Sequence, residues 1–65
     1  MMYLCEDGPI EGERINSKDV GGPYWWGESV NIPVYGPTPD DMEIAVYVLH
    51  PFLRLRFKGY NAKDD

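Results

Sequence analysis

The side chains that most often perform catalysis or bind metal ions are scarce in this sequence. It contains one histidine, His50, and one cysteine, Cys5, and no C-x-x-C or H-x-x-x-H pattern. Zinc and copper sites need several such ligands, so neither site is predicted. Glu6-Asp7 and Asp40-Asp41 do not lie in the spaced acidic loop that surrounds calcium. We therefore expect no metal ion and no cofactor.

His50 has no partner in the sequence that would make it a catalytic base. Such a base needs a nucleophile or an orienting carboxylate beside it, in a cleft that excludes water. His50 lies at a predicted hairpin tip, and both serines, Ser17 and Ser29, are far from it in sequence. Asp7-Gly8-Pro9 has the residues of a turn rather than of a phosphate-binding loop. The sequence therefore predicts a protein that is not an enzyme, with no catalytic residue.

Tyr24-Trp25-Trp26 is the strongest candidate for a binding site. Successive side chains of an extended segment face opposite ways, so we expect one tryptophan to pack and the other to be exposed. Exposed Trp and Tyr side chains are frequent anchors of protein interfaces. The alternative is that both rings belong to the core, since a short domain uses its aromatic residues for packing. The sequence leaves both possibilities open.

A second candidate is a basic strand near the end of the sequence. Arg54, Arg56 and Lys58 alternate along it, and Tyr47 is predicted to lie on the same sheet face. Such a face is able to follow a nucleic-acid backbone. The alternative is a solvated face whose cations pair with acids of the same chain. We favour this alternative, because a net charge of −5 opposes nucleic-acid binding.

The length of the chain bears on how it is stabilised. Its 65 residues predict one domain, near the lower size limit for independent folding. Such domains usually need a disulfide, a metal or a partner subunit. The lone Cys5 is predicted to be a reduced thiol, so self-association is expected, with the edge of a strand at 28–35 available for pairing. We see no signal peptide and no membrane-spanning run, and expect an intracellular protein without membrane contact.

Seven glycines and six prolines divide the sequence into short segments, which is typical of an all-β fold. Strands are predicted over 2–5, 13–16 and 28–35, the last with Val30, Ile32 and Val34 on one face. Pro33 cannot donate to a ladder, so this strand should lie at an edge of the sheet or be bulged at Pro33. Residues 17–27 are predicted to be irregular, and 38–41 to form one helical turn or a loop.

The hairpin over 43–60 is the clearest predicted unit. Pairing Leu49 with Arg54 places Val48 beside Leu55 and Val46 beside Phe57. One face is then apolar, and we expect Val46, Val48, Leu55 and Phe57 to be buried on it. Proline cannot adopt the positive φ of a two-residue turn, so a longer type I connection is predicted at Pro51. The predicted fold is a small, twisted antiparallel sheet of four or five strands, curled or partly closed as a barrel.

The order of these segments resembles that of small uncharacterised proteins of bacteriophages, especially phages of actinobacteria. The resemblance depends on the opening Gly8-Pro9-Ile10-Glu11-Gly12, the strand Asn31-Ile32-Pro33-Val34 and the closing Arg56-Phe57-Lys58-Gly59-Tyr60. It departs at Glu6-Asp7, where glycine is usual, and at Tyr24-Trp25-Trp26. The resemblance implies an accessory phage protein that acts in the host cytoplasm, and it assigns a role to no residue.

Together these observations predict a non-enzymatic protein-interaction module that binds a host protein. A homo-oligomeric structural protein, whose assembly completes the core, is the alternative. Nucleic-acid binding through Arg54, Arg56 and Lys58 ranks third.

Overall fold

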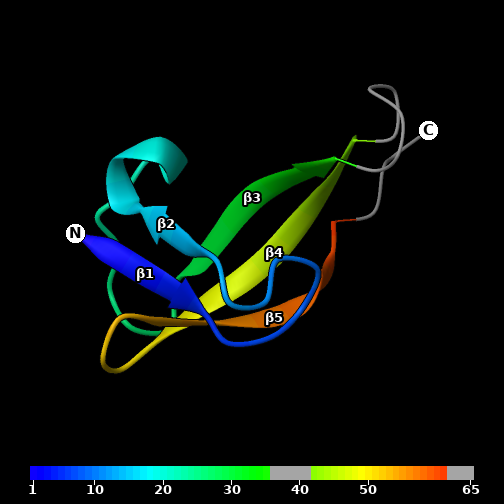
Figure 1. Ribbon diagram of the computed structural model, residues 1–65. Helices are drawn as coiled ribbons and strands as arrows, with labels where there is room; N and C mark the ends of the chain where they lie inside the picture. The colour runs from blue at the N-terminus through cyan, green and yellow to red at the C-terminus, as the bar shows by residue number, and fades with distance from the viewer. Residues whose placement is uncertain (36–41, 62–65) are drawn as a thin grey trace.

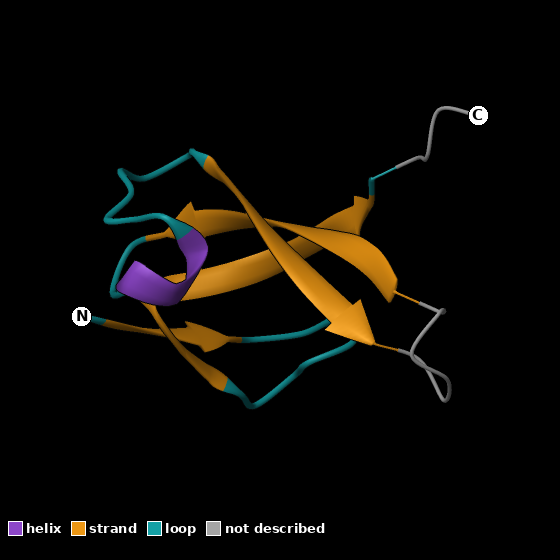
Figure 2. Cartoon of the chain, turned by 90° about the horizontal axis from the view of Figure 1, so that it is seen from above, coloured by secondary structure: helices purple, strands orange, loops and turns teal. Residues whose placement is uncertain are grey.

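The computed structural model, which describes residues 1–35 and 42–61, is a single five-stranded sheet with almost no helix (Figure 1). The elements are β1 (Met2–Cys5), β2 (Arg14–Asn16), the 3-10 helix η1 (Ser17–Val20), β3 (Ser29–Tyr35), β4 (Met42–His50) and β5 (Arg54–Tyr60). The strand order is β2-β1-β5-β4-β3. The sheet curls strongly into a half-barrel, and η1 lies between its two edge strands (Figure 2). The predicted all-β, curled fold is confirmed, while the helical turn or loop predicted at 38–41 lies outside the described residues.

One of the four strand pairs is parallel, a feature that the sequence did not indicate. β1 runs parallel to β5, with Leu4 beside Arg54 and Cys5 beside Leu55. The Leu4 amide donates to the Leu53 carbonyl and the Glu6 amide to the Leu55 carbonyl, each at 2.9 Å. The other three pairs are antiparallel. Alternation within a strand shows which side chains share a face, but it carries no information about the direction of the neighbouring strand.

The core lies on the concave side of the curled sheet. Eight buried hydrophobic residues from four strands form it: Tyr3, Cys5, Val30, Ile32, Ala45, Tyr47, Leu49 and Leu55. Val30 and Ile32 were predicted to share the inward face of their strand, and this is confirmed, with Val34 half-buried at the margin.

The predicted register of the β4–β5 hairpin is wrong by one residue. His50, not Leu49, pairs with Arg54, and Tyr47 pairs with Phe57. Because side chains alternate between faces, this shift reverses β4: its core residues are Ala45, Tyr47 and Leu49, while Val46 and Val48 are half-buried on the convex side. Of the four residues predicted to share a buried face, only Leu55 is fully buried, and Phe57 is half-buried.

Tyr47 was predicted to lie beside the basic side chains, but it is fully buried on the opposite face. Its hydroxyl donates to the Asp7 carbonyl at 2.9 Å and accepts from the Ile10 amide at 3.5 Å. Its ring lies 5.4 Å from that of Phe57, centroid to centroid. These partners satisfy the polar end of the ring, so burying it leaves no unpaired hydroxyl.

The connection between β4 and β5 has three residues, Pro51-Phe52-Leu53. It is longer than two residues, as predicted, but the predicted type I geometry is wrong, because Phe52 (67°) and Leu53 (60°) have positive φ values. Two consecutive residues with a Cβ in the left-handed region are uncommon and strained. The turn therefore displays Phe52 in a conformation that its own sequence does not favour.

The two edges of the sheet are β2 and β3. Leu49 donates its amide to the Glu28 carbonyl, so the alternation of an antiparallel ladder directs the N–H groups of Val30, Ile32 and Val34 toward β4. Pro33 therefore lies at a position that faces away from the sheet, where a donor is not needed. This placement confirms β3 as an edge strand, which Pro33 predicted.

Candidate functional site

Trp25 and Trp26 occupy a tight turn that precedes β3. The Glu28 amide donates to the Trp25 carbonyl at 3.1 Å, which closes a four-residue turn. The Glu28 side chain accepts in return from the Trp25 amide, Oε1 to N, at 3.2 Å. Gly27, the third residue, has a φ of 86°, which other residues adopt only with strain. The sequence Trp-Trp-Gly-Glu therefore supplies both the turn and the side-chain hydrogen bond that stabilises it.

The same turn is fastened to the sheet by a β-bulge. Gly27 donates its amide to the Leu49 carbonyl at 2.8 Å, and Leu49 donates its own amide to the Glu28 carbonyl at 3.1 Å. Two residues thus face one, with a positive-φ glycine in the first position, which defines a G1 bulge. The tryptophans are consequently held at the end of β4 by backbone hydrogen bonds on both sides of Gly27.

Both tryptophans are exposed to solvent, Trp25 by 80% and Trp26 by 69%. The expectation that one ring packs and the other is exposed is therefore wrong, as is the alternative that both are core residues. The reason is local: alternation applies to an extended strand, and these residues lie in a turn. Tyr24, the third residue of the predicted site, is half-buried and packs against the core.

An open pocket of about 280 Å³ lies beside the turn, lined by Met1, Pro23, Tyr24 and Trp25. Tyr24 is held in place at both ends: its amide donates to the Tyr3 hydroxyl at 3.0 Å, and its own hydroxyl donates to the Val20 carbonyl. The pocket therefore has one fixed wall, tied to the core through Tyr3, and one exposed wall, Trp25.

The Pro51-Phe52-Leu53 turn lies at the same end of the half-barrel as the tryptophans and the start of the chain (Figures 1 and 2). Phe52 is 88% exposed. We call this surface the apolar end, made of Met1, Pro23, Tyr24, Trp25, Trp26 and Phe52. Phe52 was not predicted as a site residue, although a large apolar residue directly after proline in a turn is a usable signal. Nothing in the sequence indicates that Met1 and Pro23 lie together.

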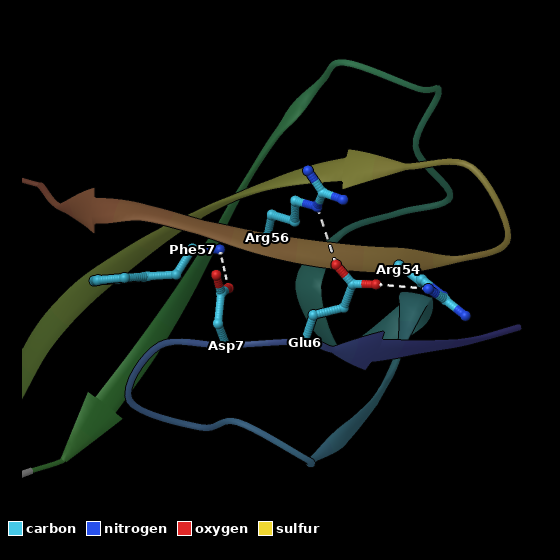
Figure 3. A network of polar contacts seen from close by, with 5 residues as sticks. All are labelled: Glu6, Asp7, Arg54, Arg56 and Phe57. Atoms are coloured by element: carbon cyan, nitrogen blue, oxygen red, sulfur yellow. Dashed lines mark hydrogen bonds and ion pairs between the residues drawn. The ribbon is translucent and has the colours of Figure 1, made fainter.

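Two side chains of the basic strand β5 form ion pairs with Glu6, the residue that follows β1 (Figure 3). Glu6 Oε1 lies 3.0 Å from Arg54 Nη1, and Glu6 Oε2 lies 3.0 Å from Arg56 Nε. The hydrogen bond from Arg56, with that from Arg54, lowers the pKa of Glu6 below its ordinary value of 4.5. Beside it, Asp7 Oδ1 accepts from the Phe57 amide at 2.7 Å. Consecutive acids thus fasten the end of β1 to β5.

This arrangement weakens the case for a nucleic-acid site. Two of the three predicted cations share one carboxylate, as the alternative interpretation expected, and Tyr47 is not on their face. Lys58 lies where the β4–β5 register shifts. The shared Glu6 carboxylate therefore partly neutralises the row of cations that a single-stranded nucleic-acid site would use.

His50 and Cys5 are the two residues whose side chains most often take part in catalysis or metal binding. Within residues 1–35 and 42–61, no three His, Cys, Asp or Glu side chains are grouped to hold a metal ion. Cys5 is a free, buried thiol. Burial, with smaller contributions from Glu13 and Asp7, raises its pKa from 9.0 to about 11, so it is protonated near neutral pH. A protonated, buried thiol is a poor nucleophile and a poor metal ligand.

Comparison with protein-family models, with curated proteins and with solved structures finds no match to this chain. No helix among the described residues is both long and apolar enough to cross a membrane.

Proposed function

We propose that this protein is a non-enzymatic protein-interaction module that binds its partner through the apolar end. The observation that carries the proposal is the exposure of both Trp25 and Trp26 on a turn fixed by hydrogen bonds at both of its ends. Tryptophan is enriched among the residues that contribute most to protein interfaces. A turn that is already ordered loses little conformational freedom on binding, which favours affinity.

The partner we propose is a protein of the bacterial host, met in the host cytoplasm. The support for this part is the resemblance of the opening and closing segments, 8–12 and 56–60, to small phage proteins. A host protein with an apolar site fits the exposed aromatic side chains of this turn. The residues that we propose to contact this host protein are those of the apolar end, and no activity is carried over from another protein.

The proposal is tested by replacing the tryptophans with alanine and capturing proteins from host lysate on immobilised chain. Because an interface anchor contributes about 2–4 kcal/mol, Trp25→Ala and Trp26→Ala should each lose the captured partner. Neither should change stability by more than about 0.5 kcal/mol, since both rings are exposed. Circular dichroism and a thermal melt check that the sheet is retained.

The matched control is Tyr35→Ala. Tyr35 is 69% exposed, the same fraction as Trp26, but it lies at the far end of β3 (Figure 1). It should retain the partner at the wild-type level. A partner that binds both tryptophan variants as well as it binds Tyr35→Ala would exclude the apolar end as the binding surface.

A further inference from the structure

We propose that, when no other partner is bound, the apolar end is occupied by a second copy of this chain. In this dimer Trp26 of each copy enters the pocket that Trp25 lines in the other. The inference rests on the proposed function, because it uses the same surface and names its occupant. It also gives a free chain a way to shield rings that are otherwise exposed to water.

The position of Trp26 relative to the pocket suits a two-fold dimer. In such a dimer both copies present the same surface, so the projecting group and the site that receives it must both lie on that surface. Here Trp25 lines the pocket, and Trp26, the next residue, is exposed and does not line it. A projecting ring and a receiving pocket on adjacent residues of one fixed turn meet this requirement.

The size and lining of the pocket fit one large side chain. Its volume of about 280 Å³ is just below the range of roughly 300–1,000 Å³ typical of small-molecule sites. Its walls include two aromatic rings, Tyr24 and Trp25, on which an incoming indole can pack edge-to-face or offset. Met1 completes it with a thioether, which also packs favourably on aromatic rings.

The exposed apolar area suits a weak dimer. A buried aromatic side chain covers about 150–250 Å², so Trp25, Trp26 and Phe52 offer on the order of 400 Å² from each copy. Met1, Pro23 and the backbone around them add to this area. Two copies therefore contribute on the order of 800 Å² from these rings, which with the added area lies in the range of weak, transient interfaces below about 1,200 Å².

The sheet edges are poorer sites for a second copy. On β3 the outward position of Pro33 removes one N–H from the free edge, which limits the length of any strand that pairs there. On β2 the strand has only three residues. Self-association was expected through the strand at 28–35, whereas the proposed dimer uses the turn immediately before that strand.

The experiment measures mass by sedimentation and light scattering on purified chain, without lysate, from low micromolar to millimolar concentration. Wild type and Tyr35→Ala should show the same concentration-dependent dimer. Trp26→Ala removes the projecting ring and Trp25→Ala removes a pocket wall, so each should weaken dimerisation about 30-fold or more. Circular dichroism confirms that each variant is folded.

A mixture of the two variants tests whether Trp26 of one copy enters the pocket of the other. Trp26→Ala keeps its pocket and Trp25→Ala keeps its projecting ring, so a mixed dimer retains one of the two contacts. The mixture should therefore have a higher average mass than either variant alone at the same total concentration. Such a gain requires that the two residues contact each other across the interface, which a general loss of apolar surface would not produce.

Three results would overturn the dimer: a monomer at every concentration, a Trp26→Ala chain that dimerises like wild type, or a mixture no heavier than its components. The proposed function is judged separately, by capture from host lysate. A monomeric wild type that still loses its partner on Trp26→Ala would contradict the dimer alone. A chain that neither dimerises nor captures a partner through its tryptophans would contradict both.

Discussion

Two pairs of large aromatic residues in this molecule have opposite environments. Tyr3 and Tyr47 are fully buried on the concave side of the sheet, and each hydroxyl has a protein partner. Trp25 and Trp26 are exposed at the end of the half-barrel. All four side chains combine a large apolar ring with one polar group. Their size and hydrophobicity therefore do not explain why one pair is buried and the other is not.

Backbone position explains the difference. Tyr3 and Tyr47 occupy inward positions of strands, where alternation directs the ring into the core and a nearby backbone group can meet the hydroxyl. Trp25 and Trp26 occupy a turn that Gly27 and Glu28 hold at the end of β4. The buried pair therefore serves stability, and the exposed pair is the one that we propose for binding. The experiments below separate these two contributions.

The largest effect is expected at Tyr47. Tyr47→Ala removes a buried ring from a core of eight residues, which should cost about 3–5 kcal/mol and unfold a domain of this size. Tyr47→Phe keeps the ring and removes only the hydroxyl contacts to Asp7 and Ile10, so about 1 kcal/mol is expected. Urea denaturation followed by circular dichroism measures both. A folded Tyr47→Ala chain with the wild-type midpoint would refute the stabilising role of this ring.

Smaller losses of stability are expected on substituting two glycines: Gly8, which lies against Tyr47, and Gly27, which follows the tryptophans. A Cβ at Gly8 would lie 2.6 Å from the Phe57 Cβ and from the Tyr47 hydroxyl, whereas a Cβ at Gly27 would meet nothing within 4 Å. Both residues have positive φ. Gly27→Ala should cost about 1–2 kcal/mol from backbone strain alone, and Gly8→Ala about 1–3 kcal/mol more from the close contacts. Equal losses in urea denaturation would show that the space around Gly8 is not tight.

The smallest effect is expected at the exposed ion pairs of Glu6. Because its pKa is lowered in the folded chain, Glu6 stabilises the fold above about pH 4.5, and this contribution is lost as the pH falls through the lower folded value. Glu6→Gln should therefore reduce stability at neutral pH and flatten its decline in acid. Thermal melts from pH 7 to 3 measure this.

The control for Glu6 is Glu11→Gln. Glu11 is exposed and forms no ion pair within the described part of the chain. It should leave the acid limb of the stability curve close to that of wild type. If both variants flatten that limb equally, the ion pairs with Arg54 and Arg56 are not its cause.

The strands could be predicted because their alternation is clear, but the hairpin register could not. Both rows of β4 are apolar, Ile44-Val46-Val48 on one side and Ala45-Tyr47-Leu49 on the other, so alternation alone does not say which faces the core. The choice is made by contacts distant in sequence, above all the Tyr47 hydroxyl with Asp7 and Ile10. Tyrosine was interpreted as an outward residue because these partners are not visible in the sequence.

The candidate site was predicted in part for a similar reason. The aromatic residues Tyr24-Trp25-Trp26 were recognised by type, but their exposure depends on a turn and a bulge formed with Leu49. Phe52 joins them only because the hairpin tip and that turn lie at the same end of the sheet (Figure 2). Residue type is local information, whereas proximity between segments is a property of the fold.

The parallel pairing of β1 with β5 has a consequence for the order of folding. Leu4 lies beside Arg54, so the first strand finds this neighbour only when the last strand is present. β4 and β5 are joined by a three-residue turn. Contacts between residues so close in sequence form quickly. β1 and β2 can pair with each other, but an isolated two-stranded hairpin is marginal in water. We therefore expect β1 to become ordered last, after residues near 55 have been synthesised.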